Sequence, residues 1–134
     1  MMKEEFILRS GSDGLDISCL TIRPEGKPKA VLQIAHGMCG YKERYMAFME
    51  YMSSHGVACV ANDHRGHGKS IRSKDDLGYM YAGGYEALAG DMRMVHEFMS
   101  GLCPEVPYYL LGHSMGSFML RKYLAFHNIM IEVK

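Results

Sequence analysis

One serine lies between two glycines, in the pentapeptide Gly112-His113-Ser114-Met115-Gly116. The G-x-S-x-G spacing is typical of a serine on a sharp strand-to-helix turn, because small flanking residues leave room for the bend. The apolar run Tyr108–Leu111 before it favours a strand, and Met115–Phe126 after it has no breaker beyond Gly116 and favours a helix. The pattern therefore predicts an exposed Ser114 hydroxyl that attacks a carbonyl carbon and forms an acyl-enzyme.

The backbone near this turn offers donors for the negative charge that such an attack creates. The N–H groups in the first turn of a helix lack partners and face the positive end of its dipole, so the Met115 N–H is one candidate. The loop His36-Gly37-Met38-Cys39-Gly40 follows a second apolar run, and the Met38 N–H is the candidate for the second donor. His36 itself could be a general base or a plain loop histidine, and we expect it to shape the loop through local bonds.

A third polar segment, residues 62–70, ends in Gly68-Lys69-Ser70, which resembles a phosphate-binding loop. A Walker loop has a glycine where Asp63 stands here, and that carboxylate would repel a phosphate. His64 and His67 are a weak metal-ligand pair, because neighbouring glycines predict an irregular loop. We therefore expect no metal and no cofactor, and we expect Asp63 and Arg65 to tie the loop down beneath the nucleophile.

The elements that would position these residues alternate along the chain. Turn-forming residues 11–14 favour an antiparallel β-hairpin at the N-terminus. Strand-like runs followed by helical stripes favour an α/β fold, with a mostly parallel sheet and helices on both faces. The expected strands are Glu5–Leu8, Ile17–Ile22, Ala30–Ala35, Val57–Ala61 and Tyr108–Leu111, and the expected helices are residues 43–55, 85–102 and 115–126.

The composition narrows the classes of partner and compartment. The 134 residues fit one domain, and 48% hydrophobic with 22% charged residues is typical of a folded protein. Lys plus Arg equals Asp plus Glu at 15 each, so nothing favours nucleic acid. The charged N-terminus and the lack of a long apolar run predict a cytoplasmic protein without stable membrane insertion. The four cysteines form no CxxC pair, so we expect reduced, mostly buried thiols.

Taken together, the loop His36-Gly37-Met38, the segment from Asp63 to Ser70 and the turn around Ser114 resemble the monoacylglycerol lipase and lysophospholipase branch of the α/β-hydrolases. This branch is also called the serine aminopeptidase S33 family, and the resemblance covers nearly the whole chain. It implies a partial α/β-hydrolase fold, with Ser114 as nucleophile and the Met38 and Met115 N–H groups as oxyanion hole. The implied substrate is a small-molecule or lipid ester.

The sequence departs from that family's pattern after the nucleophile. The triad acid and base of such enzymes follow the serine on later strand ends. Here the last twenty residues include His127 and Glu132, but a helix would carry His127 about 1.5 Å per residue away from the turn. We expect the sharp turn to send the His113 side chain elsewhere. The triad acid and base are thus not identifiable.

The sequence therefore predicts the N-terminal portion of an α/β-hydrolase domain over residues 1–134, truncated after the nucleophile helix where a sixth strand, 129–133, would begin. Three hypotheses stay open: an ester hydrolase completed by another chain or further sequence, a catalytically inactive fragment or interaction module, and a nucleotide-binding module built on residues 68–70. The strand 108–111 would lie near a sheet edge, so a complementing chain or self-association is expected.

Overall fold

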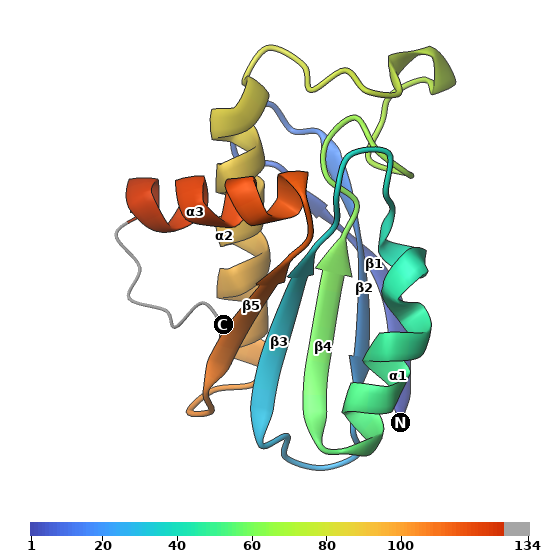
Figure 1. The fold of residues 1–134 in the computed structure, drawn as a ribbon, viewed down its shortest axis with the longest axis vertical. Coiled ribbons are helices and arrows are strands. Elements are labelled where there is room, and N and C mark those ends of the chain that lie inside the picture. Colours follow the sequence, from blue (N-terminus) through green and yellow to red (C-terminus); the bar gives the residue numbers. More distant parts are fainter. Residues whose placement is uncertain (128–134) are drawn as a thin grey trace.

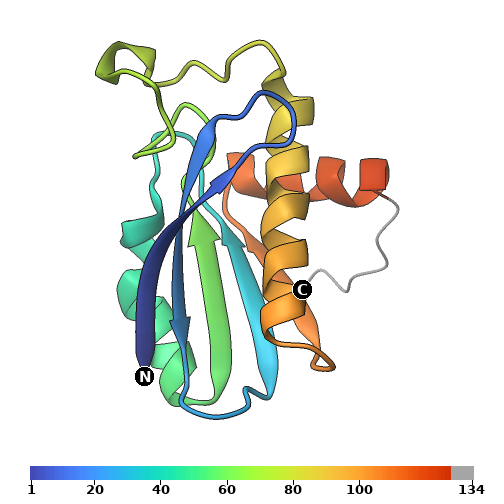
Figure 2. The same ribbon diagram turned by 180° about the vertical axis from the view of Figure 1, so that it is seen from behind.

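The computed structural model describes residues 1–127 and contains a five-stranded sheet with helices on both faces (Figures 1 and 2). The strands are β1 (Met2–Arg9), β2 (Asp16–Arg23), β3 (Ala30–Ala35), β4 (Val57–Asn62) and β5 (Tyr108–Gly112). The helices are α1 (Met46–Ser54), α2 (Gly84–Leu102) and α3 (Met115–His127), with short 3-10 turns η1 (Lys42–Tyr45) and η2 (Lys74–Asp76).

The strand order is β1-β2-β4-β3-β5. Strands β1 and β2 form the expected antiparallel hairpin, and β2 also pairs antiparallel with β4. Strand β3 pairs parallel with β4 on one side and with β5 on the other. The α/β class is confirmed, in a mixed sheet whose parallel part is β4-β3-β5.

Alternate residues of the central strands face two different cores. Leu32 and Ile34 of β3 pack with Met49 of α1, whereas Val31 of the same strand packs with Val95 and Met99 of α2. This alternation follows from the two-residue period of a strand. Helix α3 packs on the α2 side, through a cluster that joins Ala35, Leu110, Met92, Leu120 and Tyr123.

The chain reverses its direction across the sheet at β3. From β3 it moves through α1 to β4, and it then returns through α2 to β5 on the other side of β3. Open α/β sheets bind ligands at such a switch point, outside the carboxyl ends of the strands. That location lies between the ends of β3 and β5, where residues 36–38 and Ser114 follow their strands.

The predicted elements match the observed ones within a few residues, with one difference in the connection between β3 and β4. The stripe from Glu43 was expected to be one helix, but it begins as the 3-10 turn η1 and becomes α1 at Met46. Lys42 is buried at the start of this turn, and the tight geometry brings its backbone N–H to a carboxylate described below. The expected sixth strand, 129–133, and the expected helix cap Asn128 lie outside the described residues.

Three of the four free cysteines are buried and Cys39 is exposed. No helix in residues 1–127 has the length and apolar character needed to cross a membrane.

Candidate active site

Ser114 occupies a sharp turn between β5 and α3. Its φ of 55° lies in the left-handed region, which side-chain-bearing residues rarely adopt, and its side chain is exposed. The turn closes through a hydrogen bond from the Gly116 N–H to the His113 carbonyl at 2.9 Å, and the Ser117 N–H donates to the Ser114 carbonyl at 2.9 Å. The predicted strand, bend and helix are all present.

The two glycines flanking Ser114 are required by close packing. A Cβ on Gly116 would lie 2.1 Å from the Ala35 carbonyl oxygen, and a Cβ on Gly112 would lie 2.7 Å from the backbone of Ser117. Real Cβ atoms do not approach other atoms so closely, so any larger residue would push α3 away from β3 and β5.

The loop after β3 lies directly beside the Ser114 turn. The His113 N–H donates to the Ala35 carbonyl at 3.1 Å, which extends the pairing of β5 with β3 to the turn itself. A Cβ built on Gly37 would lie 3.3 Å from Ser114 Cβ. A hollow of about 300 Å³ opens between the two segments, lined by Gly37, Met38, Gly40, Arg44, Tyr45, His113 and Ser114. The structure thus brings together the predicted serine and the predicted donor loop.

The side chains of Met38 and Met115 lie in different environments. The Met38 side chain is 62% exposed at the rim of the hollow, whereas the Met115 side chain is buried in the core between α2 and α3. Only their N–H groups were expected to act, and Met115 is the first residue of α3, where such groups lack helical partners.

His36 is held by local bonds on both ring nitrogens. Its Nδ1 lies 2.7 Å from the Gly37 carbonyl, and its Nε2 accepts a hydrogen bond from the His64 N–H at 2.9 Å. The His64 Nε2 lies 3.1 Å from the His36 carbonyl, so the two residues join the ends of β3 and β4 reciprocally. Since Nε2 of His36 accepts, its Nδ1 carries the hydrogen that the carbonyl accepts, and the ring is neutral.

The environment of this pair also favours neutral rings. Burial lowers the pKa of His36 to about 4, and burial lowers the pKa of His64 well below its usual value. His36 therefore shapes the loop next to Ser114, as its local bonds indicate, and it has no free nitrogen with which to accept a proton from the serine.

Asp63 organises the loop after β4. Its carboxylate accepts hydrogen bonds from the Lys42 N–H at 2.7 Å, the Lys42 ammonium at 2.9 Å and the Lys69 N–H at 3.0 Å. A Cβ on Gly68 would lie 2.3 Å from the same carboxyl carbon. The loop of residues 63–70 thus wraps a carboxylate of its own chain, in the place where a phosphate-binding loop would hold its ligand.

Lys42 holds this loop from within, a role that was not predicted from the sequence. Its fully buried ammonium also forms ion pairs with Glu43 at 2.6 Å and Glu5 at 3.3 Å. Burial alone would lower the pKa of Lys42, but hydrogen bonds to Glu43 and Asp63 outweigh this and raise it, so the side chain stays charged. The partners come from β1, from η1 and from the loop after β4, and no local sequence pattern predicts these pairings.

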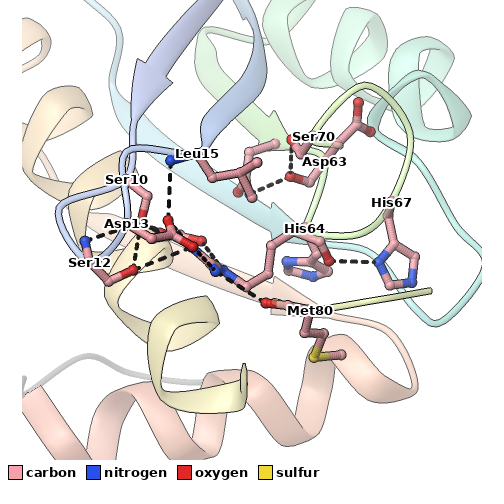
Figure 3. A network of polar contacts seen from close by, with 12 residues as sticks. Ser10, Ser12, Asp13, Leu15, Asp63, His64, His67, Ser70 and Met80 are labelled. Atoms are coloured by element: carbon pink, nitrogen blue, oxygen red, sulfur yellow. Dashed lines mark hydrogen bonds and ion pairs between the residues drawn. The ribbon is translucent and has the colours of Figure 1, made fainter. Parts of the chain in front are cut away.

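Arg65 is fully buried and joins the hairpin turn, the segment before α2 and α2 itself. Figure 3 labels four of its partners, Ser10, Ser12, Asp13 and Met80. Its Nε donates to the Asp91 carboxylate of α2 at 2.8 Å, and its Nη1 donates to Asp13 at 3.0 Å and to the Met80 carbonyl at 3.1 Å. Asp63 and Arg65 both tie the loop down, as expected, but not beneath the nucleophile. The Asp63 carboxylate bonds to Lys42 and Lys69, and the Arg65 guanidinium bonds to the hairpin turn, to Met80 and to α2. None of these hydrogen bonds runs to the Ser114 turn.

His113 differs from expectation. Its side chain was expected to turn away from the site, but it lines the same hollow as Ser114, and its Nδ1 would lie 3.1 Å from a Cβ on Gly37. The strand pairing of His113 with Ala35 holds the ring over the 36–38 loop. No hydrogen bond joins the Ser114 hydroxyl to any histidine within residues 1–125, whose side chains the structure describes.

The remaining candidate bases lie farther along the chain. His127 ends α3, which runs crosswise from the Ser114 turn (Figure 1) and spans about 18 Å between Met115 and His127 at 1.5 Å per residue. Glu132 lies outside the described residues. Within the described part of the chain, no group of three His, Cys, Asp or Glu side chains is arranged to hold a metal ion.

The family model described as "Serine aminopeptidase, S33" matches residues 26–132. The chain belongs to this family. The S33 match contains both the 36–38 loop and the Ser114 turn, so the resemblance expected from the sequence is confirmed.

Individual S33-like relatives agree with this assignment. Monoglyceride lipase of Rattus norvegicus is 30% identical over 105 residues, which are 78% of this chain and 33% of the lipase. The monoglyceride lipase homolog of Monkeypox virus is 35% identical over 104 residues, which are 75% of this chain and 35% of that protein. The chain spans about a third of the length of these curated relatives.

A solved structure supports the fold. A highly thermostable carboxyl esterase from Bacillus coagulans, crystallised in complex with glycerol, has a TM-score of 0.89 at 28% identity, over 99% of this chain and 43% of the esterase. The S33 chain therefore has a partial α/β-hydrolase fold.

Proposed function

We propose that this chain is the nucleophile-bearing, N-terminal portion of a serine hydrolase that cleaves carboxylic esters of the monoacylglycerol or lysophospholipid type through a Ser114 acyl-enzyme. The observation that carries the proposal is the turn at Ser114, with its left-handed backbone, its exposed side chain and the 36–38 loop against it. The similarity to monoglyceride lipases and to a carboxyl esterase supports the choice of ester substrates.

The reaction would use the groups around the hollow in a fixed order. Ser114 Oγ attacks the ester carbonyl carbon while a base takes its proton, and the developing oxyanion accepts hydrogen bonds from the Met38 and Met115 N–H groups. The alcohol then leaves with a proton, and water hydrolyses the acyl-enzyme. Arg44 is among the residues that line the hollow, and its guanidinium, which lies over the Tyr41 ring, can donate hydrogen bonds to a hydroxylated alcohol group.

The base and acid are the missing parts of this scheme. His36 and His64 are buried, neutral and committed to other bonds, and Ser114 lacks a histidine partner among the described residues. We therefore propose that a complementing chain or further sequence supplies both groups. A hydrolase without its base retains only about 10³–10⁴-fold catalysis over water, so the chain alone should be a feeble esterase.

The alternative is a catalytically inactive fragment or an interaction module, because Ser114 lacks a bonded base.

Under either hypothesis, the cytoplasmic location and the lack of a cofactor stay predictions.

A fluorophosphonate probe separates the two functions. Because the chain alone lacks its base, the probe should label the native protein slowly, over a prolonged incubation. Ser114→Ala should lose this label, while Ser117→Ala, three residues along and also exposed, keeps it. The labelled peptide, identified by mass spectrometry, should contain Ser114. Absence of labelling, or equal labelling of the native protein and Ser114→Ala, would refute the hydrolase and favour the interaction module.

A further inference from the structure

Two consecutive residues after β4 hold both ends of the loop that follows β3. At the first end, the His64 N–H donates to His36 Nε2 at 2.9 Å, and His64 Nε2 lies 3.1 Å from the His36 carbonyl oxygen. At the second end, the N–H and the ammonium of Lys42 donate to the two oxygens of the Asp63 carboxylate, at 2.7 Å and 2.9 Å. The Met38 N–H, the candidate oxyanion donor, therefore lies in a segment that is anchored on each side.

Asp63 is itself fixed to the sheet and to its own loop. Its N–H donates to the Ser18 carbonyl of β2 at 2.9 Å, and its carbonyl accepts a hydrogen bond from the Ser70 hydroxyl at 2.7 Å. Its carboxylate also accepts a hydrogen bond from the Lys69 N–H at 3.0 Å. The bonds of Lys42 to Asp63 therefore join the loop after β3 to a fixed part of the fold.

Asp63 differs from the other carboxylates near the Lys42 ammonium. The side chains of Lys42 and Asp63 are both 0% exposed, whereas those of Glu5 and Glu43 are 47% and 35% exposed. Charges attract most strongly where water is excluded, and removal of one partner from a buried pair leaves an uncompensated charge. The pair of Lys42 with Asp63 is thus the contact that most strongly constrains the end of the loop.

The turn that carries the candidate donor is strained. The Gly40 N–H donates to the Gly37 carbonyl at 3.0 Å, which closes a four-residue turn with Met38 and Cys39 at its centre. The φ of Cys39 is 61°, in the left-handed region that residues with a Cβ rarely adopt. A conformation of this kind persists only where the surrounding structure holds it in place. Gly37 lies against Ser114, so a change in this turn would move the Met38 N–H relative to the nucleophile.

We propose that Lys42 and Asp63 are positioning residues for the oxyanion hole. Their buried ion pair fixes the far end of the 36–42 loop and thereby aims the Met38 N–H at the charge that develops when Ser114 attacks an ester. Neither residue lines the hollow at Ser114, so both act through the loop and not by contact with the substrate. The inference rests on the proposed function and deepens it, since it adds two residues outside the hollow on which the reaction depends.

Two probes that differ in one atom test this role. Rates of Ser114 phosphonylation should be measured with an alkyl fluorophosphonate and with its P=S counterpart, over the prolonged incubation that the chain alone requires. Sulfur is a weak hydrogen-bond acceptor, so the oxyanion donors accelerate mainly the reaction of the P=O probe. Lys42→Met should lower the ratio of the P=O rate to the P=S rate about tenfold, because a misplaced donor no longer stabilises the oxyanion. A general loss of folded protein would lower both rates together and leave the ratio intact.

Lys69→Met is the matched control. The Lys69 side chain is 69% exposed and pairs with Glu5 at 2.9 Å, and its hydrogen bond to Asp63 comes from the backbone N–H, which the substitution keeps. This variant should retain the native ratio. Asp63→Asn should lower the ratio as Lys42→Met does, and it replaces that variant in each measurement if Lys42→Met does not fold. The double variant should lower the ratio no further than the single variants, because both remove the same contact.

A spin label provides a readout that needs no reaction at Ser114. Cys39 is exposed at the centre of the turn, whereas the other three cysteines are buried, so a nitroxide label attaches selectively there. Lys42→Met should narrow the electron paramagnetic resonance lines of the label, because the turn moves more freely, and Lys69→Met should leave them unchanged. If no probe labels Ser114 but the line width still follows Lys42, the positioning of the loop is supported and the hydrolase function fails. An unchanged line width, or an unchanged ratio of rates while Ser114 is labelled, overturns the inference.

Discussion

The backbone of Ser114 lies in the left-handed region, at a position where the proposed chemistry requires a side chain. A residue with a Cβ in this region costs about 1–2 kcal/mol, which the surrounding packing must offset. The exposed Ser114 hydroxyl forms no hydrogen bond within the described residues, so it does not offset this cost. Such local strain is typical of functional positions, and it has a measurable signature in the free energy of unfolding.

We expect Ser114→Gly to be more stable than Ser114→Ala by about 1 kcal/mol, because glycine adopts positive φ without strain. Urea denaturation monitored by circular dichroism measures the difference. At Ser117, in the first turn of α3, the order should reverse, and Ser117→Gly should be less stable than Ser117→Ala by about 1 kcal/mol. The same order at both positions would mean that the turn at Ser114 is not strained.

The two helical glycines 90 and 116 provide a second test at the residue scale. A Cβ on Gly90 in α2 meets nothing within 4 Å, whereas a Cβ on Gly116 would lie 2.1 Å from the Ala35 carbonyl. Gly90→Ala should stabilise the protein by about 1 kcal/mol through helix propensity. Gly116→Ala should destabilise it by about 1–3 kcal/mol through overpacking and should slow phosphonylation of Ser114. Thermal unfolding of both variants checks the opposite signs.

His36 predicts a specific pH dependence. Its pKa falls from 6.5 to about 4 on folding, so the unfolded chain binds the proton more readily and stability rises with pH. The contribution of neutral His36 to the free energy of unfolding is complete above pH 6.5 and is lost as the pH falls toward 4. The loss amounts to roughly 1–3 kcal/mol. Urea midpoints across this range should show the slope. His36→Gln should reduce the slope, and substitution of the exposed His55 by Gln should leave it intact.

At the scale of elements, helix α2 is anchored to the hairpin turn and the 63–70 loop by the buried pair of Arg65 and Asp91. Removing Asp91 leaves a guanidinium buried with one fewer partner, so Asp91→Ala should cost about 3–5 kcal/mol. Glu97 on the same helix pairs with Arg93 at an exposed site, and Glu97→Ala should cost less than about 0.5 kcal/mol. Equal losses in chemical denaturation would contradict the anchoring role of Arg65.

The elements themselves were predictable because their signals are local. Glycine and proline bound the apolar runs that became β3, β4 and β5, and the period of 3–4 residues defines α2. The site was predictable only where the motif is local, as around Ser114. Lys42 bonds to Asp63, 21 positions away along the chain, and Arg65 bonds to Asp91, 26 positions away, and to Ser10, 55 positions away. A single sequence carries no signal for such distant partners. The direction of the His113 side chain depends on the pairing of β5 with β3, so the prediction that it turns away from the site was wrong.

At the scale of the whole molecule, the two edges of the described sheet differ. Strand β1 carries Lys3, Glu4 and Glu5, which discourage pairing with another chain. Strand β5 at the opposite edge has the sequence Tyr-Tyr-Leu-Leu-Gly and carries no charge. An edge of this kind is a template for further strands.

We therefore expect concentration-dependent association in sedimentation velocity experiments. Tyr109→Lys, which adds a charge to β5, should shift the equilibrium toward the monomer, whereas Ile7→Lys on β1 should change it little. A monomer at all concentrations would contradict the prediction that the exposed edge of β5 mediates self-association.

The two-faced character of β3 also bears on how related sequences can diverge. Its neighbouring residues belong to separate cores, so deletion or insertion of one residue within Ala30–Ala35 would exchange the inward positions of both layers at once. Related sequences should therefore differ in length in the connection of residues 24–29 and keep the same length within the strand. An alignment of many homologues should therefore contain gaps within residues 24–29 and none within Ala30–Ala35.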